Sequence, residues 1–344
     1  MWPRRASTKT TTDLPEAAGG TPAGQQPAAS TDIPASTDTA AVASAPGIGS
    51  GPPSSTTVGE PSGRRQRRRS LLPSYPPPGY LGQLDPAFQQ ALARTRSQAD
   101  LEDLVWYHTV ELPDGTVLPG AWDLRGREAA YLGGVELAGR RVLELGPASG
   151  YLTFHMERQG TQVVAFDVGF DVAVDLLPVA GVEDPNEKAL VMTGTIDRNH
   201  DAWWYLHRTF GSSAAFVQGD IYDLPADLGT FDVTVAGALL LHLRDPWGAL
   251  RQAARRTTGC IVVTEPLQDD LAPPDSNIMR FSPSAKEHIS NWWSIYPGAV
   301  VAMLRRLGFA DTEVTFHRQR HHLGHDLSVE AVEQPMYTVV GRRP

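Results

Sequence analysis

Apolar and polar positions along the chain predict a parallel sheet with helices between its strands. Short apolar runs, each followed by Gly or an acid or leading to a turn, occur at Arg141–Leu145, Val163–Asp167, Ala215–Gln218, Phe231–Ala236 and Ile261–Thr264. Such runs are typical of strands buried on both faces, and helical patterns separate these five. Thr312–Phe316 and Met336–Val340 predict a terminal antiparallel pair. We therefore expect an α/β fold with a seven-stranded, mostly parallel sheet covered by helices on both faces.

The segment before the first of these strands predicts a cap. Apolar residues at helical spacing between Leu84 and Leu104 predict one or two helices. Asp114-Gly115 between alternating runs predicts a hairpin, and Asp123–Gly134 predicts a further helix. We expect residues 80–138 to form this helix and hairpin cap, and residues 139–344 to form the main domain.

Composition separates the first 79 residues from the rest. They are rich in Pro, Ala, Ser, Thr and Gly and contain almost no large aliphatic residues. Such a segment cannot bury enough apolar surface to offset the entropy of ordering, so we expect a disordered tail over 1–79. Its arginine run, Arg64–Arg69, could contact nucleic acid, an acidic partner or anionic lipid, or could serve as a charged linker.

The charge of the remaining chain argues against nucleic acid as a partner. The tail holds eight of the 30 Lys and Arg and five of the 39 Asp and Glu, which leaves 22 basic and 34 acidic residues and a net charge of −12. An acidic body binds phosphates poorly over its whole surface. No run of about 18 apolar residues is present, so we expect no membrane segment and a cytoplasmic protein. The single cysteine, Cys260, is expected to pack in the core.

The turn after the first strand carries the strongest chemical signal. Its sequence is Glu144-Leu145-Gly146-Pro147-Ala148-Ser149-Gly150. Glycines let a backbone approach a ligand closely, and the start of the next helix offers unpaired N–H groups. Asp167, which ends the second strand, is placed to hold the two hydroxyls of a ribose. These features predict a nucleoside-containing cofactor, whereas Ala148 at the middle glycine position fits a dinucleotide fingerprint poorly.

The turn resembles motif I of the class I S-adenosylmethionine (SAM)-dependent methyltransferases, (D/E)-x-G-x-x-x-G, with Ala148 in place of a usual glycine. The resemblance implies a Rossmann-like domain that binds SAM through Glu144, Gly146, Ala148, Gly150, Asp167, Asp220, Ile221 and Gly237. In that family a carboxylate at the position of Asp220 accepts the exocyclic amine of adenine, while the residue at Ile221 packs on the ring. The alternative is that Asp220 only caps the next turn.

A histidine follows the fourth strand in Leu239-Leu240-Leu241-His242-Leu243-Arg244-Asp245-Pro246. Many members of the resembled family have a histidine in this setting, near the transferred methyl group. An imidazole can take a proton from a hydroxyl or amine near neutral pH. We expect His242 to be a general base; the alternative is a histidine that packs beneath the donor and bonds to the backbone.

Aromatic residues in three insertions predict an acceptor pocket if the insertions converge. The proposed lining is Trp106, Tyr107, His108, Trp203, Trp292 and Trp293. Core packing is the alternative role for at least half of the aromatic residues in these insertions. The cluster His321-His322-Leu323-Gly324-His325-Asp326 could bind a metal, but it has no structured ligand spacing, and we expect no metal site.

These features together predict a methyltransferase that uses SAM to methylate an oxygen or nitrogen of a small-molecule acceptor, such as a secondary metabolite or a sugar. The stretches Trp106–Thr109 and Pro119–Asp123 look like the tRNA wobble-uridine modification enzymes that use a carboxylated SAM. Two alternatives therefore stay open: RNA modification, and a catalytically silent protein that binds SAM.

Overall fold

The five apolar runs form the parallel centre of one sheet. In the computed structural model they are β4 (Arg141–Leu145), β5 (Gln162–Val168), β6 (Ala215–Gly219), β7 (Phe231–Gly237) and β8 (Thr257–Pro266). Their order is β8-β7-β4-β5-β6, and every neighbouring pair is parallel. Most of their inner residues are buried, which explains why each run is continuously apolar. The sequence prediction of these strands is confirmed, although β8 is longer than expected.

Two long C-terminal strands extend the sheet, as predicted. β12 (Val332–Arg342) pairs antiparallel with β8, and β11 (Asp311–His321) pairs antiparallel with β12. β11 therefore runs in the same direction as β8, and its last residues lie at the edge where the parallel strands end.

An eighth strand corrects the expectation of seven strands. β3 (Trp122–Asp123) pairs antiparallel with Arg320 and His321 of β11. The helix expected over Asp123–Gly134 is reduced to α3 (Glu128–Tyr131). Backbone pairing draws Asp123 into the sheet, and Gly126 adopts a φ of +76°, which a helix cannot accommodate.

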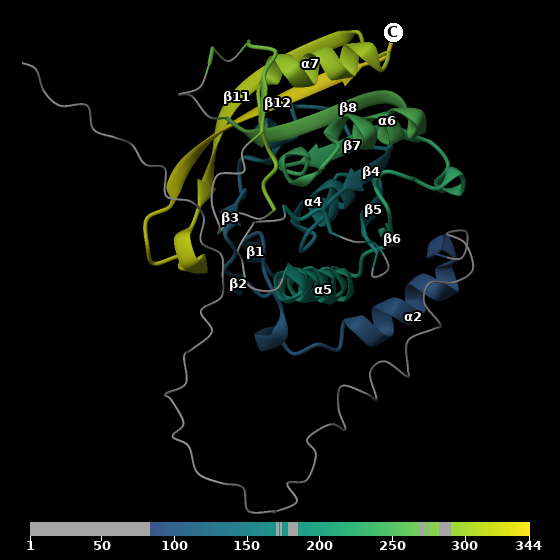
Figure 1. Cartoon of the computed structure of the whole chain (residues 1–344). Helices are drawn as coiled ribbons and strands as arrows, with labels where there is room; N and C mark the ends of the chain where they lie inside the picture. Colours follow the sequence, from purple (N-terminus) through teal and green to yellow (C-terminus); the bar gives the residue numbers. More distant parts are fainter. Residues whose placement is uncertain are drawn as a thin grey trace, which may run out of the picture. The chain divides into compact units, whose positions relative to one another are not determined.

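Helices cover both faces of the sheet. α4 (Tyr151–Arg158) and α5 (Pro185–Phe210) share one hydrophobic core cluster, whereas α6 (Pro246–Arg256) and α7 (Pro297–Arg306) share the other. Figure 1 shows α7 beside β12, α6 beside β8, and α5 below the parallel strands. The remaining short elements are β1 (Val110–Glu111), β2 (Val117–Leu118), β9 (Met279–Phe281), β10 (Trp293–Ile295), η2 (Leu101–Asp103), η3 (Ala226–Leu228), η4 (Leu240–His242) and η5 (Leu323–His325). β1 and β2 pair antiparallel and confirm the predicted hairpin.

The structure describes residues 83–344, with gaps at 170–171, 173, 178–184, 268–271, 274 and 282–289. The predicted tail and its arginine run lie outside the described residues. The division at residue 138 stays a prediction. Cys260 is buried in β8, as expected. None of the helices in the described part is both long and apolar enough to span a membrane.

Glutamine side chains pair with the exposed edge of β6. Gln89 of α2 (Pro86–Arg96) accepts a hydrogen bond from Phe216 N at 2.9 Å and donates one to Phe216 O at 2.8 Å. Gln83 makes the same two contacts with the backbone of Gln218, at 2.9 and 2.8 Å. An edge strand presents unpaired N–H and C=O groups, and these amides satisfy them as a further strand would. They also fasten α2 to the sheet.

We expect Gln89→Ala to lower the free energy of unfolding by about 1–3 kcal/mol, because it leaves the polar backbone of Phe216 without partners. Urea denaturation measures the change. Gln90→Ala is the matched control, since Gln90 is exposed on the same helix. Equal stability of the two variants would contradict this role of Gln89.

Candidate functional site

The carboxyl ends of β4 and β7 hold two alanines in a left-handed conformation. Ala148 has a φ of +48° and Ala238 a φ of +47°, and His325 is the only other non-glycine residue of the described part with positive φ. Residues with a Cβ adopt this conformation only where the surroundings impose it, and such positions cluster at ligand sites. β4 and β7 are neighbours, so both unusual turns lie close together at the carboxyl ends of the parallel strands.

The glycine turn rests on a tryptophan. Gly150 has a φ of +91°, and a Cβ at this position would lie 2.5 Å from Cδ1 of Trp203. Trp203 is fully buried on α5, and its Nε1 donates a hydrogen bond to Thr153 Oγ1 at 3.0 Å. No residue larger than glycine fits at position 150 without a shift of this core. Trp203 therefore supports the turn from below.

Glu144 is a buried acid directly below the turn. Its side chain accepts a hydrogen bond from the Thr153 hydroxyl. Burial raises the pKa of Glu144 to about 7; the hydrogen bond from Thr153 opposes the rise, and the negative charge of Asp167 adds to it. Two acids that influence each other at one strand edge favour a ligand that carries positive charge.

Asp167 and Asp220 follow at the ends of β5 and β6. Asp167 Oδ1 accepts a hydrogen bond from Val168 N at 2.8 Å, and its Oδ2 lies 3.1 Å from Nε2 of His200. Asp220 Oδ1 accepts a hydrogen bond from Tyr222 N at 2.8 Å, so it does cap the next turn. Asp220 and Ile221 are only partly buried, which leaves both accessible beside Asp167.

Glu265, at the end of β8, holds the loop after β7. Its Oε1 accepts hydrogen bonds from Leu239 N at 3.1 Å and Leu240 N at 2.7 Å, while Oε2 is buried without a partner. Burial raises the pKa of Glu265 to about 8, although backbone N–H groups oppose the rise. Glu265 was not among the site residues predicted from the sequence. In the sequence, Glu265 is marked only by its position as the acid that follows the fifth apolar run.

His242 lies in this same loop. Its Nδ1 is 3.0 Å from the carbonyl oxygen of Ser290, so the Nδ1 proton donates to that carbonyl. Burial lowers the pKa of His242, although hydrogen bonds with Ser290 and Asn291 oppose this. The imidazole is therefore neutral at pH 7. Neutrality suits a general base, whereas the backbone contact suits the packing alternative, so both interpretations stay open.

The segment from Tyr107 to Asp123 crosses the same sheet edge. Ser149 Oγ, in the glycine turn, lies 3.2 Å from Tyr107 N and 3.3 Å from His108 N and accepts both hydrogen bonds. His108 is buried with Nδ1 unpaired, and burial lowers its pKa to about 3. These bonds fasten the cap segment directly over the turn.

The six aromatic and histidine residues predicted to line one pocket are not all brought together. Trp106 and Trp203 belong to one core cluster, and Trp293 packs against the other. Trp292 and Trp293 donate their indole N–H groups to the carbonyls of Asp175 and Leu243. Of the six, Tyr107 and His108 contact the glycine turn through their backbone, and Trp203 packs beneath it.

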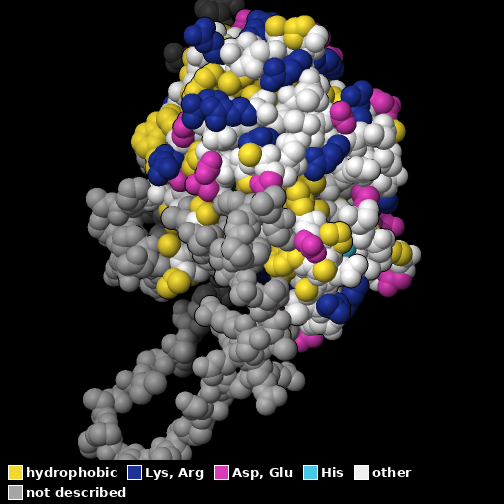
Figure 2. Space-filling view, turned by 90° about the vertical axis from the view of Figure 1, so that its right-hand side faces the viewer, with side chains coloured by type: hydrophobic (Ala, Val, Ile, Leu, Met, Phe, Trp, Pro, Cys, Tyr) yellow, Lys and Arg dark blue, Asp and Glu magenta, His cyan; other side chains and the backbone are white. Residues whose placement is uncertain are grey.

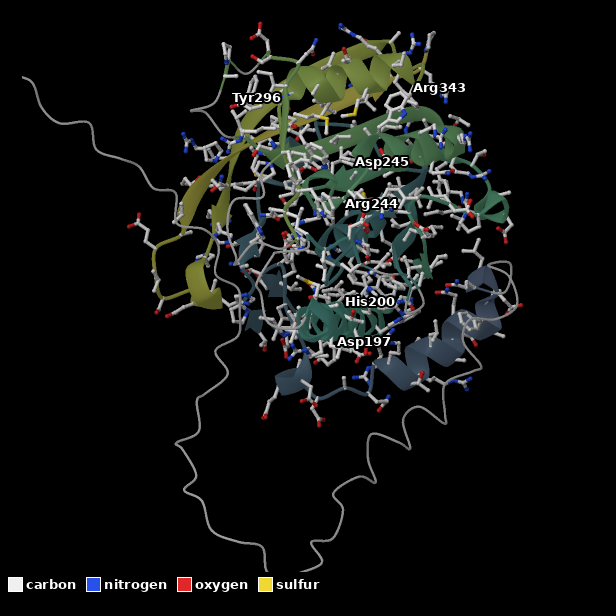
Figure 3. The ribbon with its side chains drawn as sticks, viewed as in Figure 1. Asp197, His200, Arg244, Asp245, Tyr296 and Arg343 are labelled. Carbon is white, nitrogen blue, oxygen red and sulfur yellow. The ribbon has the colours of Figure 1, made fainter. Side chains whose placement is uncertain are left out.

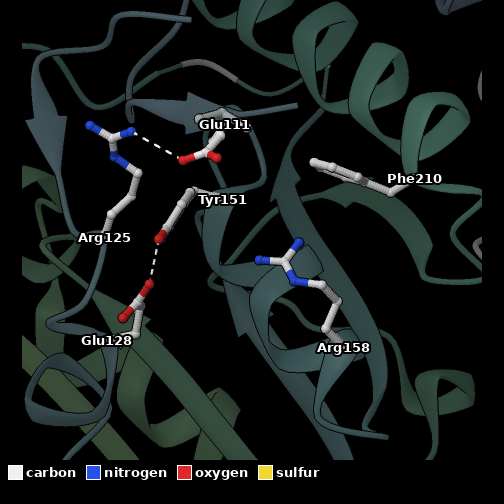
Figure 4. Close-up of a pocket in the computed structure, with 7 residues that line it drawn as sticks. Glu111, Arg125, Glu128, Tyr151, Arg158 and Phe210 are labelled. Carbon is white, nitrogen blue, oxygen red and sulfur yellow. Dashed lines mark hydrogen bonds and ion pairs between the residues drawn. The ribbon is translucent and has the colours of Figure 1, made fainter. Parts of the chain in front are cut away.

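A cavity of about 210 Å³ lies beside the turn (Figure 4). It is lined by Val110, Glu111, Arg125, Glu128, Tyr151, Arg158 and Phe210. Tyr151 directly follows Gly150, and its hydroxyl donates a hydrogen bond to Glu128. Arg125 lies 3.6 Å from Glu111 and also pairs with Asp123. The cavity thus combines two aromatic rings with acids and arginines, and sequence periodicity gave no signal for it.

A second cavity adjoins the first through Arg125. It measures about 430 Å³ and is lined by Asp123, Arg125, Arg320, His322 and residues 327–331. Among the described residues, no group of three His, Cys, Asp or Glu side chains is arranged to hold a metal ion.

A family model described as a methyltransferase domain matches residues 123–314. Comparison with curated proteins found no match. Among solved structures, the N-terminal domain of EvdMO1, crystallised in the presence of SAH (S-adenosylhomocysteine) and D-fucose, is 20% identical, with 74% of this chain and 97% of that chain covered and a TM-score of 0.46. The 1,6-didemethyltoxoflavin-N1-methyltransferase of Burkholderia thailandensis is 16% identical, with coverage of 64% and 78% and a TM-score of 0.41. No functional conclusion follows from these distant similarities, and none of the comparisons shows the finer similarity to tRNA-modifying enzymes.

We expect the stability difference between wild type and Glu265→Gln to depend on pH. The raised pKa means that the folded state binds this proton more tightly than the unfolded state, so ionisation of Glu265 lowers stability as pH rises from 4.5 through about 8. The amide cannot ionise. Urea unfolding at several pH values should show that the free energy of unfolding of Glu265→Gln, relative to that of wild type, increases as pH rises.

Glu265→Ala is the companion variant, because it removes the acceptor of two backbone N–H groups. It should be less stable than Glu265→Gln at every pH. A pH-independent difference between wild type and Glu265→Gln would count against the buried, proton-binding carboxyl.

Proposed function

The chain belongs to the methyltransferase domain family and is a SAM-dependent methyltransferase, and from this premise we propose that it methylates an oxygen or nitrogen of a small-molecule acceptor. The cavity beside the glycine turn is the observation that carries the proposal. It lies between the cap segment and Tyr151, and its volume is about 210 Å³. Its lining combines two aromatic rings with a few charged side chains, as sites for small organic molecules do.

Residues at the carboxyl ends of the parallel strands fit the donor. Glu144 and Asp167 offer negative charge to an ammonium group and to ribose hydroxyls, and Asp220 with Ile221 offers an acceptor and an apolar contact to adenine. Left-handed turns at Gly146–Gly150 and Ala238 bring the backbone close to the ligand. The unpaired, buried Oε2 of Glu265, at the end of β8, indicates a polar group set for a further partner.

In this proposal the protein contributes to the reaction by positioning the two reactants and by excluding water. When bound, SAM supplies a methyl group on a positively charged sulfur. The cap segment, held by Ser149, covers the turn and keeps water from it. A neutral His242 can take the proton that an acceptor hydroxyl or amine releases, while orientation of the two reactants supplies most of the rate.

Charge on the surface supports a small acceptor over RNA. Figure 2 shows Lys and Arg side chains interspersed with Asp and Glu over the described part of one face. Residues 80–344 carry a net charge of −12. An RNA acceptor would need a basic surface and would bind with strong salt dependence.

We expect calorimetry to detect binding of one SAH per chain. Asp167→Asn should weaken this binding by about tenfold or more, because a charge-assisted hydrogen bond to ribose contributes about 1.5–3 kcal/mol. Asp311→Asn is the matched control, since Asp311 is exposed at the start of β11, on the opposite edge of the sheet. Absence of SAH binding by a folded wild type would refute the proposal.

We expect His242→Asn to lower kcat by about 10²–10⁴, because the amide can still donate to Ser290 O but cannot accept the proton. The measurement uses an acceptor selected from a panel of hydroxylated and aminated sugars and aromatic compounds. SAH affinity should stay within about threefold of wild type. Turnover within a few-fold of wild type would assign His242 the packing role.

A further inference from the structure

We propose that His200 is a positioning residue that orients Asp167 toward the donor ribose. The inference rests on the proposed function, since it concerns the same donor site. His200 lies on α5 and is 1% exposed. Figure 3 labels both His200 and Asp197 on α5, with His200 nearer the strands. Asp197 and Asp201 pair with Arg96 of α2, which fixes the helix.

The tautomer of His200 follows from its neighbours. Gln218 Nε2 lies 3.3 Å from the carbonyl oxygen of Val168 and 2.9 Å from Nδ1 of His200. A carbonyl only accepts, so the amide nitrogen of Gln218 faces this group, and an amide nitrogen only donates. His200 Nδ1 must therefore accept, and a neutral imidazole then carries its proton on Nε2.

The Nε2 atom that carries this proton lies beside Asp167. Nε2 lies 3.1 Å from Asp167 Oδ2 and has no aligned hydrogen bond. A buried N–H without a partner is costly, which favours a carboxylate turned toward it. Val168 N already holds Oδ1 at 2.8 Å. A hydrogen bond on Oδ1 and a nearby donor at Oδ2 restrict the orientation of the carboxylate, and each oxygen keeps a lone pair for the ribose hydroxyls.

Gln218 and His200 are themselves held in place by neighbouring residues. Gln218 is bonded through both its backbone N–H and its C=O to Gln83. The His200 ring packs edge-on against Phe216, with centroids 5.0 Å apart. A continuous series of contacts thus runs from Gln83 through Gln218 and His200 to Asp167. Networks of this kind hold a binding group in its productive orientation before the ligand arrives.

Two substitutions of His200 separate orientation from packing. His200→Gln places an amide near the position of Nε2, where it can still donate to Asp167. His200→Asn places an amide near Nδ1, within reach of Gln218 only. The probes are SAH and its 2′-deoxyribose analogue, measured by calorimetry. We expect His200→Asn to weaken SAH binding by about tenfold and to reduce the preference for SAH over the deoxy analogue. His200→Gln should stay within about threefold on both measures.

A double variant supplies the decisive control. If His200 acts through Asp167, then His200→Asn should weaken SAH binding little further when Asp167→Asn is already present. Equal losses in the two backgrounds, or an unchanged preference for SAH over the deoxy analogue, would overturn the inference. If His200→Asn does not fold, Gln218→Met removes the amide that sets the tautomer and should give the same loss of preference. Failure of the wild type to bind SAH would overturn the proposed function as well.

Discussion

The packing of the glycine turn on Trp203 is the constraint on which the site depends. Gly150 can adopt its left-handed conformation against this ring only because it lacks a Cβ. The turn then places Ser149 to accept the cap backbone and Tyr151 to line the cavity. Below it, Glu144, Thr153 and Trp203 form one hydrogen-bonded series. The packing of Gly150 on Trp203 therefore fixes the turn that the cap segment contacts and that borders the cavity.

Burial determines the electrostatics of this edge. The pKa values of Glu144 and Glu265 rise to about 7 and about 8 because their carboxyls lie in the protein interior. Both acids thus change charge near neutral pH, at the place where a positively charged donor would bind. A positively charged ligand bound there would stabilise the ionised forms of both acids.

Sequence predicted the sheet well because buried parallel strands carry a direct signal. Continuous apolar runs located β4 to β8, and the acids that follow them located Asp167 and Asp220. The eighth strand was missed, since the two residues Trp122 and Asp123 are too few for a period to show. His200 and Glu265 were not selected because their roles arise from contacts between distant segments. The sequence could not separate packing from binding among the aromatic residues expected to line a pocket, since apolar rings such as Trp203 serve packing as readily as binding.

The most direct test is a crystal structure of the protein with bound SAH. We predict that the ribose contacts Asp167, that the adenine lies between Asp220 and Ile221, and that the sulfur faces the cavity bordered by Tyr151 and Glu128. SAH bound elsewhere, or bound with its sulfur turned away from that cavity, would contradict the account.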